Sequence, residues 1–177
     1  MTEVDIGTLH AVGERWELRF ERRFPHPPEK VWRALTEPEH LKEWFPNDIE
    51  GERKEGAILR HVFRNNEAPD MKGEMLAFEP PAVLEFTWGE DTLRFELRST
   101  DDGNGTVLDF VDVLEDVGKA ARDGAGWHVC LDGLEEHLRG EPSHWNDMDR
   151  WKPVHERYVE EFPPEASTIG VPESRES

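Results

Sequence analysis

The sharpest candidate for chemistry is an aspartate inside an apolar stretch. Alternation places four residues on one face of an expected strand over 106–115: Leu108, Phe110, Asp112 and Leu114. If that face points inward, Asp112 enters an apolar interior, where loss of water raises the pKa of a carboxyl group and suits it to act as acid, base or cation partner. A bulge or a strand end here would instead leave Asp112 in water. From the sequence both alternatives stay open.

The eight histidines are the next candidates for proton chemistry or metal binding. Five of them show no ligand spacing such as H-x-x-x-H: His40, His61, His137, His144 and His155. His128 and Cys130 are two residues apart in an expected helix, so their side chains point to different sides and do not share an ion. We therefore expect no metal site and no cofactor. His61 faces the interior only if its strand keeps its alternation.

No stretch of the chain shows the pattern of a Ser-His-Asp set, a Gly-rich phosphate loop or a paired-carboxylate motif. The single cysteine, Cys130, excludes a disulfide framework and fits a reducing compartment. Because it lies on an apolar helical stripe, we expect it to be an inert core residue. The sequence thus assigns no catalytic residue.

Regular patterns with turn signals between them predict the elements that position these side chains. Alternating bulky and charged residues predict a half-buried strand at 14–24. Pro27-Pro28-Glu29 begins a helix that ends before Pro38, and a second short helix closes at Pro46. About six strands follow, with candidates at 58–64, 71–78, 83–88, 93–98 and 106–115.

The longest helical pattern covers about 119–139. Its apolar stripe consists of Trp127, Cys130, Leu131, Leu134 and Leu138. Three glycines in this helix, at 124, 126 and 133, each cost about 1 kcal/mol relative to alanine. We expect Gly126, next to Trp127, to allow close packing of the helix on the sheet, with room for a ligand beside these small residues as the alternative. The layout is α+β, a curved antiparallel sheet around one amphipathic helix.

Composition divides the 177 residues into three regions. Residues 1–13 form a loose lead-in, 14–140 the folded domain, and 141–177 an acidic, proline-containing tail in which 165–177 is expected to be disordered. A short amphipathic helix is expected to start at Pro153. The tail also carries large aromatic residues that should be buried on the domain or on a second subunit, as in a homodimer: Trp145, Trp151, Tyr158 and Phe162.

Charge and hydropathy exclude several partners. With 21 basic and 40 acidic residues, the net charge of −19 argues against nucleic acid and anionic membranes. No apolar run approaches the roughly 18 residues of a membrane-spanning helix. The first residues lack the basic and apolar regions that are typical of a signal peptide. A cytoplasmic location is expected.

The chain resembles the SRPBCC (START-like, Bet v 1-like) superfamily, and within it the group named after the C-terminal domain of the Hsp90 ATPase activator. Three segments carry the likeness: FERRFPHPPEKVWRALTEPEHLKEWF at 20–45, KGEMLAFEPPAVLEFTW at 72–88 and GWHVCLDGLEEHL at 126–138. The likeness covers about residues 15–140. Relatives often have histidine where this chain has Asp112, so no role of that histidine transfers.

The resemblance implies a helix-grip fold with an apolar cavity between sheet and C-terminal helix. The expected lining residues are Trp44, Phe45, His61, Phe63, Met75, Phe86, Trp88, Phe95, Phe110, Asp112, Trp127 and Leu131. The leading hypothesis is a carrier or sensor that binds an apolar small molecule there. One alternative is a co-chaperone or stress-response protein with a chaperone partner. The other is a cyclase-like enzyme on an aromatic or polyketide substrate, with Asp112 or His61 as base.

Overall fold

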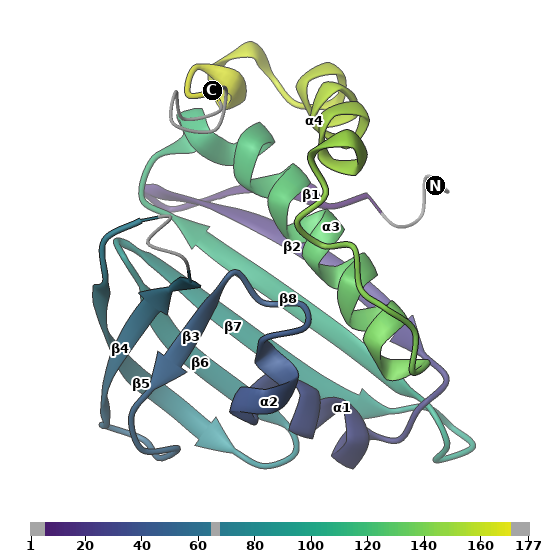
Figure 1. Cartoon of the computed structure of the whole chain (residues 1–177). Helices are drawn as coiled ribbons and strands as arrows, with labels where there is room; N and C mark the ends of the chain where they lie inside the picture. Colours follow the sequence, from purple (N-terminus) through teal and green to yellow (C-terminus); the bar gives the residue numbers. More distant parts are fainter. Residues whose placement is uncertain (1–5, 65–67, 171–177) are drawn as a thin grey trace.

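Eight antiparallel strands form one curved sheet in the order β1-β2-β8-β7-β6-β5-β4-β3 (Figure 1). The computed structural model describes residues 6–64 and 68–170. The strands are β1 Thr8–Val12, β2 Arg15–Phe24, β3 Asn47–Glu50, β4 Ile58–Phe63, β5 Met71–Glu79, β6 Val83–Trp88, β7 Asp91–Ser99 and β8 Thr106–Leu114. In that part of the chain, no helix is both long and apolar enough to cross a bilayer.

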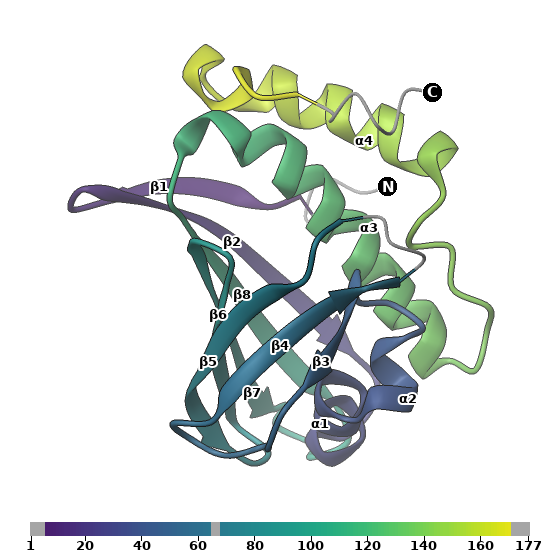
Figure 2. The same cartoon turned by 60° about the vertical axis from the view of Figure 1, so that its left-hand side comes forward.

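Helix α3, Ala120–Leu138, lies across the concave face of the sheet, and helices α1, Pro28–Thr36, and α2, Pro38–Leu41, cover one end of it (Figures 1 and 2). Proline explains both short helices. Helix α1 begins with Pro28, and it ends at Thr36 because Glu37, which precedes Pro38, is extended; Pro38 is then the first residue of α2. The expected α+β helix-grip fold is confirmed. The six strands after the short helices are confirmed too, although the sequence did not place β3.

The apolar stripe of α3 is buried as expected. Trp127 is 4% exposed, and Leu131, Leu134 and Leu138 are each buried. On the sheet, alternation in β2 turns Leu18 and Phe20 inward to the same core. The core therefore lies between the concave face of the sheet and α3.

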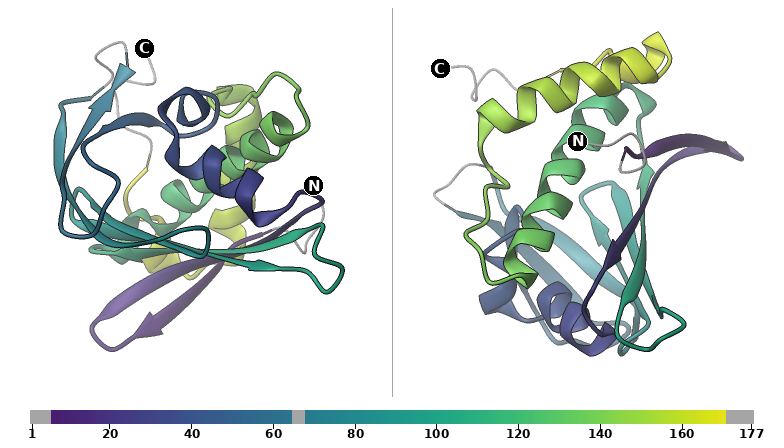
Figure 3. Two further views of the ribbon diagram at one scale, coloured as in Figure 1. Left: turned by 90° about the horizontal axis from the view of Figure 1, so that it is seen from below. Right: turned by 90° about the vertical axis from the view of Figure 1, so that its right-hand side faces the viewer.

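The tail is part of this fold. Helix α4, Met148–Glu161, lies against the outer side of α3 (Figures 1 and 3). Its aromatic residues Trp151, Tyr158 and the following Phe162 are buried, while Trp145 is half-buried. Their own chain thus covers the apolar surface that suggested a second subunit. The helix begins at Met148 rather than Pro153, because Asp147 caps it by accepting a hydrogen bond of 2.9 Å from the backbone N–H of Asp149.

Two expectations about irregular ends are corrected. The lead-in 1–13 contains β1, an edge strand that pairs with β2 around the turn at Gly13 (φ 61°). Disorder from residue 165 is wrong for 165–170, where Ala166 is fully buried and Ile169 donates its N–H to the carbonyl of Gly118 at 3.0 Å. Residues 1–5 and 171–177 lie outside the described part of the chain.

Gly126 and Gly133 of α3 face the tail and not the sheet, which corrects the expected packing, while Gly124 lies near both the tail and Leu18 of β2. A Cβ added to Gly133 would lie 2.8 Å from the Cβ of Trp145, and one added to Gly124 would lie 3.2 Å from the ring of Tyr158. Gly126 faces Trp151, whose Nε1 would be 4.0 Å away. Close approach of the tail to α3 therefore requires glycine at 133.

Candidate functional site

The structure brings the expected lining residues together in one aromatic interior. Ring contacts link Trp44, Phe45, His61, Phe63, Phe86, Trp88, Phe95, Phe110 and Trp127. Met75 and Leu131 are buried in the same core. Phe63 and Trp88 are only half-buried, so they form the rim of this interior.

The interior is filled by these side chains. The rings of Phe95 and Phe110 stack with centroids 4.5 Å apart, and Trp127 lies 5.2 Å from both Trp88 and Phe110. A void of about 10 Å³ beside Met75 and Phe86 is the size of one water molecule. In place of the expected open cavity, the described residues form a packed core in which rings must move apart before a ligand can enter.

A polar chain holds the rim in place. The indole Nε1 of Trp88 donates a hydrogen bond of 2.8 Å to Oδ1 of Asn47, whose Nδ2 donates to Nδ1 of His61 at 3.0 Å. The other ring nitrogen of His61 then donates to the carbonyl of Thr87 at 2.9 Å. Burial lowers the pKa of His61. The imidazole is thus neutral with both nitrogens engaged, which leaves it no lone pair to act as a base.

Asp112 points inward and is fully buried. Strand β8 pairs in unbroken register through this residue, opposite Leu18 of β2 and Leu93 of β7, so neither a bulge nor a strand end places it in water. Its Oδ2 accepts a hydrogen bond of 2.9 Å from the indole Nε1 of Trp127. Desolvation, followed by the charge of Asp91 and a hydrogen bond with it, raises the pKa of Asp112 well above its usual range.

Two further aspartates, Asp91 and Asp123, complete this site, and the sequence did not single them out. Asp91 begins β7 after the tight turn at Gly89 (φ 63°) and is 1% exposed. Its Oδ1 accepts from the backbone N–H of Glu115 at 3.0 Å and pairs with Nζ of Lys119 at 2.7 Å.

Asp123, in the first turn of α3, pairs with Arg122 at 2.8 Å. Burial raises its pKa against the opposing effect of Arg122. One carboxylate oxygen from each of Asp91, Asp112 and Asp123 lies within 4.8 Å of the others.

Two oxygens of this carboxyl cluster (Asp91, Asp112 and Asp123) face no donor group among the described residues: Oδ2 of Asp91 and Oδ1 of Asp112. The hydrogen bond between Asp91 and Asp112 therefore needs an added proton. Two neighbouring carboxylates in an apolar setting do not both ionise, and one of them keeps a proton. A proton on Asp112 that is shared with Asp91 satisfies both oxygens at once. Chemically, the cluster holds an exchangeable proton at the inner end of an aromatic interior.

Comparison with protein families supports the same fold. Residues 25–139 match the family model described as Activator of Hsp90 ATPase homolog 1-like protein. The chain belongs to this family, AHSA1. The sequence-based assignment to the SRPBCC superfamily is thereby confirmed, and the match covers every strand from β3 to β8 and all of α3.

Solved structures share the fold of this AHSA1 member. EF2215 from Enterococcus faecalis, a conserved protein of unknown function, is 21% identical with a TM-score of 0.71, covering 88% of this chain and 89% of that one. CalU16 from Micromonospora echinospora is 25% identical (TM-score 0.67, covering 88% and 93%). The protein encoded by BPP1335 from Bordetella parapertussis is 24% identical (TM-score 0.67, covering 92% and 96%). No match was found among curated proteins.

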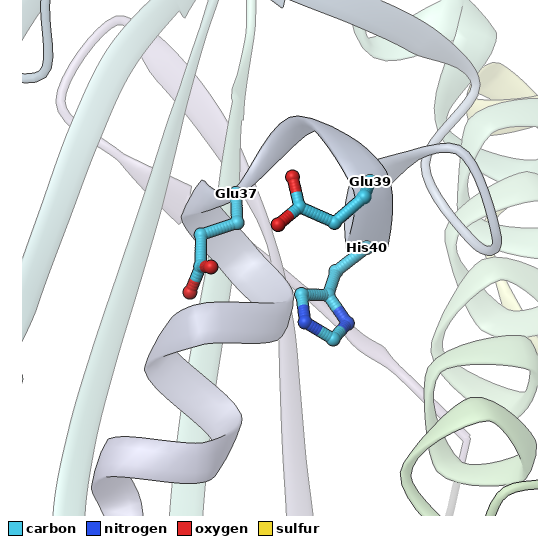
Figure 4. A group of neighbouring side chains, drawn as sticks. All are labelled: Glu37, Glu39 and His40. Atoms are coloured by element: carbon cyan, nitrogen blue, oxygen red, sulfur yellow. The ribbon is translucent and has the colours of Figure 1, made fainter.

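A surface cleft of about 510 Å³ lies away from the carboxyl cluster, between α1, α2 and the end of α3. Basic side chains from α1 line it together with His40 and His137, whose ring nitrogens lie 2.8 Å apart. Figure 4 shows Glu37, Glu39 and His40 around the turn between α1 and α2, with one ligand-type atom of each within 4.8 Å of the others.

These three side chains reach water, since Glu39 is exposed and the other two are half-buried. No atom of theirs is among the buried polar atoms without a partner in the described chain. Solvation accounts for the surface group without an ion, whereas the buried carboxyl cluster needs a proton or another cation.

Proposed function

We propose that this AHSA1 member binds a flat aromatic small molecule in the interior between the sheet and α3. One observation carries the proposal: a continuous series of rings leads from the half-buried rim, Phe63 and Trp88, to buried Trp127, which hydrogen-bonds Asp112. A site of this kind, mostly apolar with one or two polar groups at a defined end, is typical of small-ligand pockets.

Trp88 is the side chain best placed to move aside. It is half-buried at the rim, and its indole nitrogen is held by a hydrogen bond to Asn47. A ligand that replaces its ring contacts with Trp127 regains aromatic contact, and burying apolar area is favourable by about 25 cal/mol per Å². The ligand would therefore take over contacts that Trp88 makes in the free protein.

The test is a titration of the wild type with 2-naphthalenemethanol, a neutral aromatic probe. Binding is measured by calorimetry and by the change in tryptophan fluorescence. We expect saturable binding of one probe per chain and faster association in Trp88→Ala, because the blocking ring is removed. Trp145→Ala is the matched control, since this half-buried tryptophan lies against Gly133 on the opposite side of α3. Absence of saturable binding to the wild type would overturn the proposal even if Trp88→Ala bound the probe.

For the enzymatic alternative, the expected base was Asp112 or His61. His61 is neutral and doubly hydrogen-bonded, so Asp112 is the remaining candidate for proton transfer in this interior. Conversion of an aromatic probe that is lost in Asp112→Asn would assign catalysis to the site in place of binding alone.

A further inference from the structure

We infer that the interior ligand carries a basic nitrogen, and that its ammonium group replaces the single proton held between Asp91 and Asp112. This inference rests on the interior binding proposed above and names the chemical class of the ligand. It starts from the two buried carboxylate oxygens that face no donor among the described residues, Oδ2 of Asp91 and Oδ1 of Asp112. Both side chains are at least 99% buried, at 1% and 0% exposure.

The charges of the cluster identify what fits there. The carboxyl groups of Asp91, Asp112 and Asp123 are opposed by the cations of Lys119 and Arg122. Three acids and two bases leave one negative charge, and burial of an uncompensated charge is strongly unfavourable. One monovalent cation restores neutrality. In the free protein a proton does so, and in the complex an ammonium group would.

A divalent metal ion fits this site less well. It would leave the group with one positive charge in excess, and it would lie beside Nζ of Lys119, which is already 2.7 Å from Oδ1 of Asp91. Oxygen-ligated divalent ions also take six or more oxygens, whereas the cluster offers three aspartates. The charge balance therefore favours an organic cation.

Among the described residues, the strand partners and the hydrogen-bond donor of Asp112 are uncharged. Its neighbours in the sheet are Leu18 of β2 and Leu93 of β7, and from α3 it meets the indole of Trp127. The charged groups that act on Asp112 are Asp91, Asp123 and Lys119, while Arg122 acts on Asp123.

The rim and the cluster are adjacent, which sets the shape of the ligand. Trp88 pairs directly with Asp91 across the β6–β7 hairpin, and its ring lies 5.2 Å from that of Trp127. A ligand ring in the place of the Trp88 ring would bring a nitrogen on a short arm toward Asp91 and Asp112. The face of Trp127 would add a cation–π attraction.

The exchange is balanced in atoms and charge. The ligand arrives as an ammonium ion, its N–H groups donate to Oδ2 of Asp91 and Oδ1 of Asp112, and the O–H proton of Asp112 leaves to solvent. One cation enters and one proton departs. Affinity for the amine should consequently rise with pH, by up to about tenfold per pH unit, for as long as Asp112 is protonated in the free protein.

The experiment compares 2-naphthylmethylamine with 2-naphthalenemethanol, which has the same ring and a neutral arm. Binding of each probe is measured by calorimetry at pH 7 in two buffers of different ionisation enthalpy. The difference between the two observed enthalpies gives the number of protons released per probe bound. We expect one proton released per amine bound and none per alcohol.

In Asp112→Asn the amine should lose roughly tenfold or more in affinity, since about 1.4 kcal/mol corresponds to tenfold, and release no proton, while the alcohol binds as before. Asp109→Asn is the control, because Asp109 lies on the same strand but beside Arg98 at the surface.

Asp112→Asn is suited to this test because the amide resembles the protonated acid. Its oxygen accepts from Trp127 and its NH₂ donates to Asp91, so the fold should be retained, as near-ultraviolet circular dichroism would check.

Equal binding of the two probes to the wild type without proton release would overturn the inference and leave the proposed function standing. Amine binding with proton release that persists in Asp112→Asn would also overturn it. If neither probe binds the wild type, the proposed function fails and the inference fails with it.

Discussion

The indole Nε1 of Trp127 donates a hydrogen bond of 2.9 Å to Oδ2 of Asp112, and the other oxygen of that carboxyl group faces no donor among the described residues. The pair joins α3 to β8, and both side chains are buried, with Trp127 4% and Asp112 0% exposed. Because both side chains lie in the core, the protonation state of Asp112 is expected to affect the stability of the fold.

The first prediction concerns stability and pH. Burial and Asp91 raise the folded-state pKa of Asp112 above its unfolded value of about 3.8. A raised carboxyl pKa contributes stability that is fully present below the unfolded pKa and is lost as pH rises through the folded pKa. The wild type should therefore lose stability relative to Asp112→Asn as pH increases above about 4.

Urea unfolding of the two proteins between pH 4 and pH 9 checks this. A constant difference across that range would show that Asp112 titrates normally. The difference between the variants isolates Asp112 from other groups, such as Glu136. Burial acts to raise the pKa of Glu136, but hydrogen bonds from Arg150 and His144 outweigh burial and lower it, so its effect on stability has the opposite sign.

The second prediction separates the two roles of Trp127. Trp127→Ala should cost about 3–5 kcal/mol of unfolding free energy, as for other buried aromatic residues. Trp127→Phe keeps a ring in the core but removes the donor to Asp112, and should cost about 1–3 kcal/mol. Denaturant titration measures both. No loss in Trp127→Phe would mean that the hydrogen bond contributes nothing beyond ring packing, and equal losses would mean that the retained ring recovers no stability.

The third prediction uses two glycines of the same helix. Gly133→Ala should destabilise the protein, because its Cβ would lie 2.5 Å from Oγ of Ser143 and 2.8 Å from Cβ of Trp145. Gly126→Ala should stabilise it by up to about 1 kcal/mol, since alanine favours the helix and the nearest atom is 4.0 Å away. Thermal melts should shift in opposite directions. A gain in both variants would contradict the close packing of the tail.

The fourth prediction concerns Tyr158, which is fully buried in α4. Its hydroxyl oxygen accepts from the backbone N–H of Gly7 at 2.7 Å and lies 2.9 Å from Nδ1 of His128. Tyr158→Phe should cost about 1–3 kcal/mol, because it leaves buried polar groups without this partner. The exposed Val159→Ala in the same helix is the control and should be nearly neutral. An unchanged melting temperature in Tyr158→Phe would show that the tail is only loosely attached.

Sequence periodicity predicted which side chains are buried where burial depends on residues nearby in sequence. The period of 3.6 residues in α3 predicted that Trp127 faces the core. The period of two in β8 placed Asp112 on the same face as Leu108, Phe110 and Leu114, but the sequence left open whether that face points inward or a bulge puts Asp112 in water. Asp91 was missed for a different reason. Its burial depends on the β7–β8 register and on where α3 begins, and Glu115 and Lys119, which contact it, are more than twenty residues away in sequence.

In the tail and in the interior, too, contacts between residues far apart in sequence could not be predicted from local patterns. Aromatic spacing predicted that Tyr158 and Phe162 would be buried, but the place where Tyr158 packs depends on Gly124 of α3, which a local pattern does not reveal. The rings expected around a cavity were identified correctly as a group. Whether such rings enclose space or fill it depends on their rotamers and mutual contacts, which periodicity does not specify.

The pairing of β2 with β8 joins distant parts of the chain, with Trp16 opposite Leu114 and Phe24 opposite Thr106. During synthesis β2 leaves the ribosome long before β8, and for that time one of its edges has no strand to pair with. Closing so long a loop is entropically costly and slows folding. The alternating charges of β2, Glu17, Arg19 and Glu21, suit this interval, since charged side chains discourage pairing with the wrong chain. Until β8 is synthesised, we therefore expect the charged side chains of β2, and not its final strand pairing, to keep the nascent chain from aggregating.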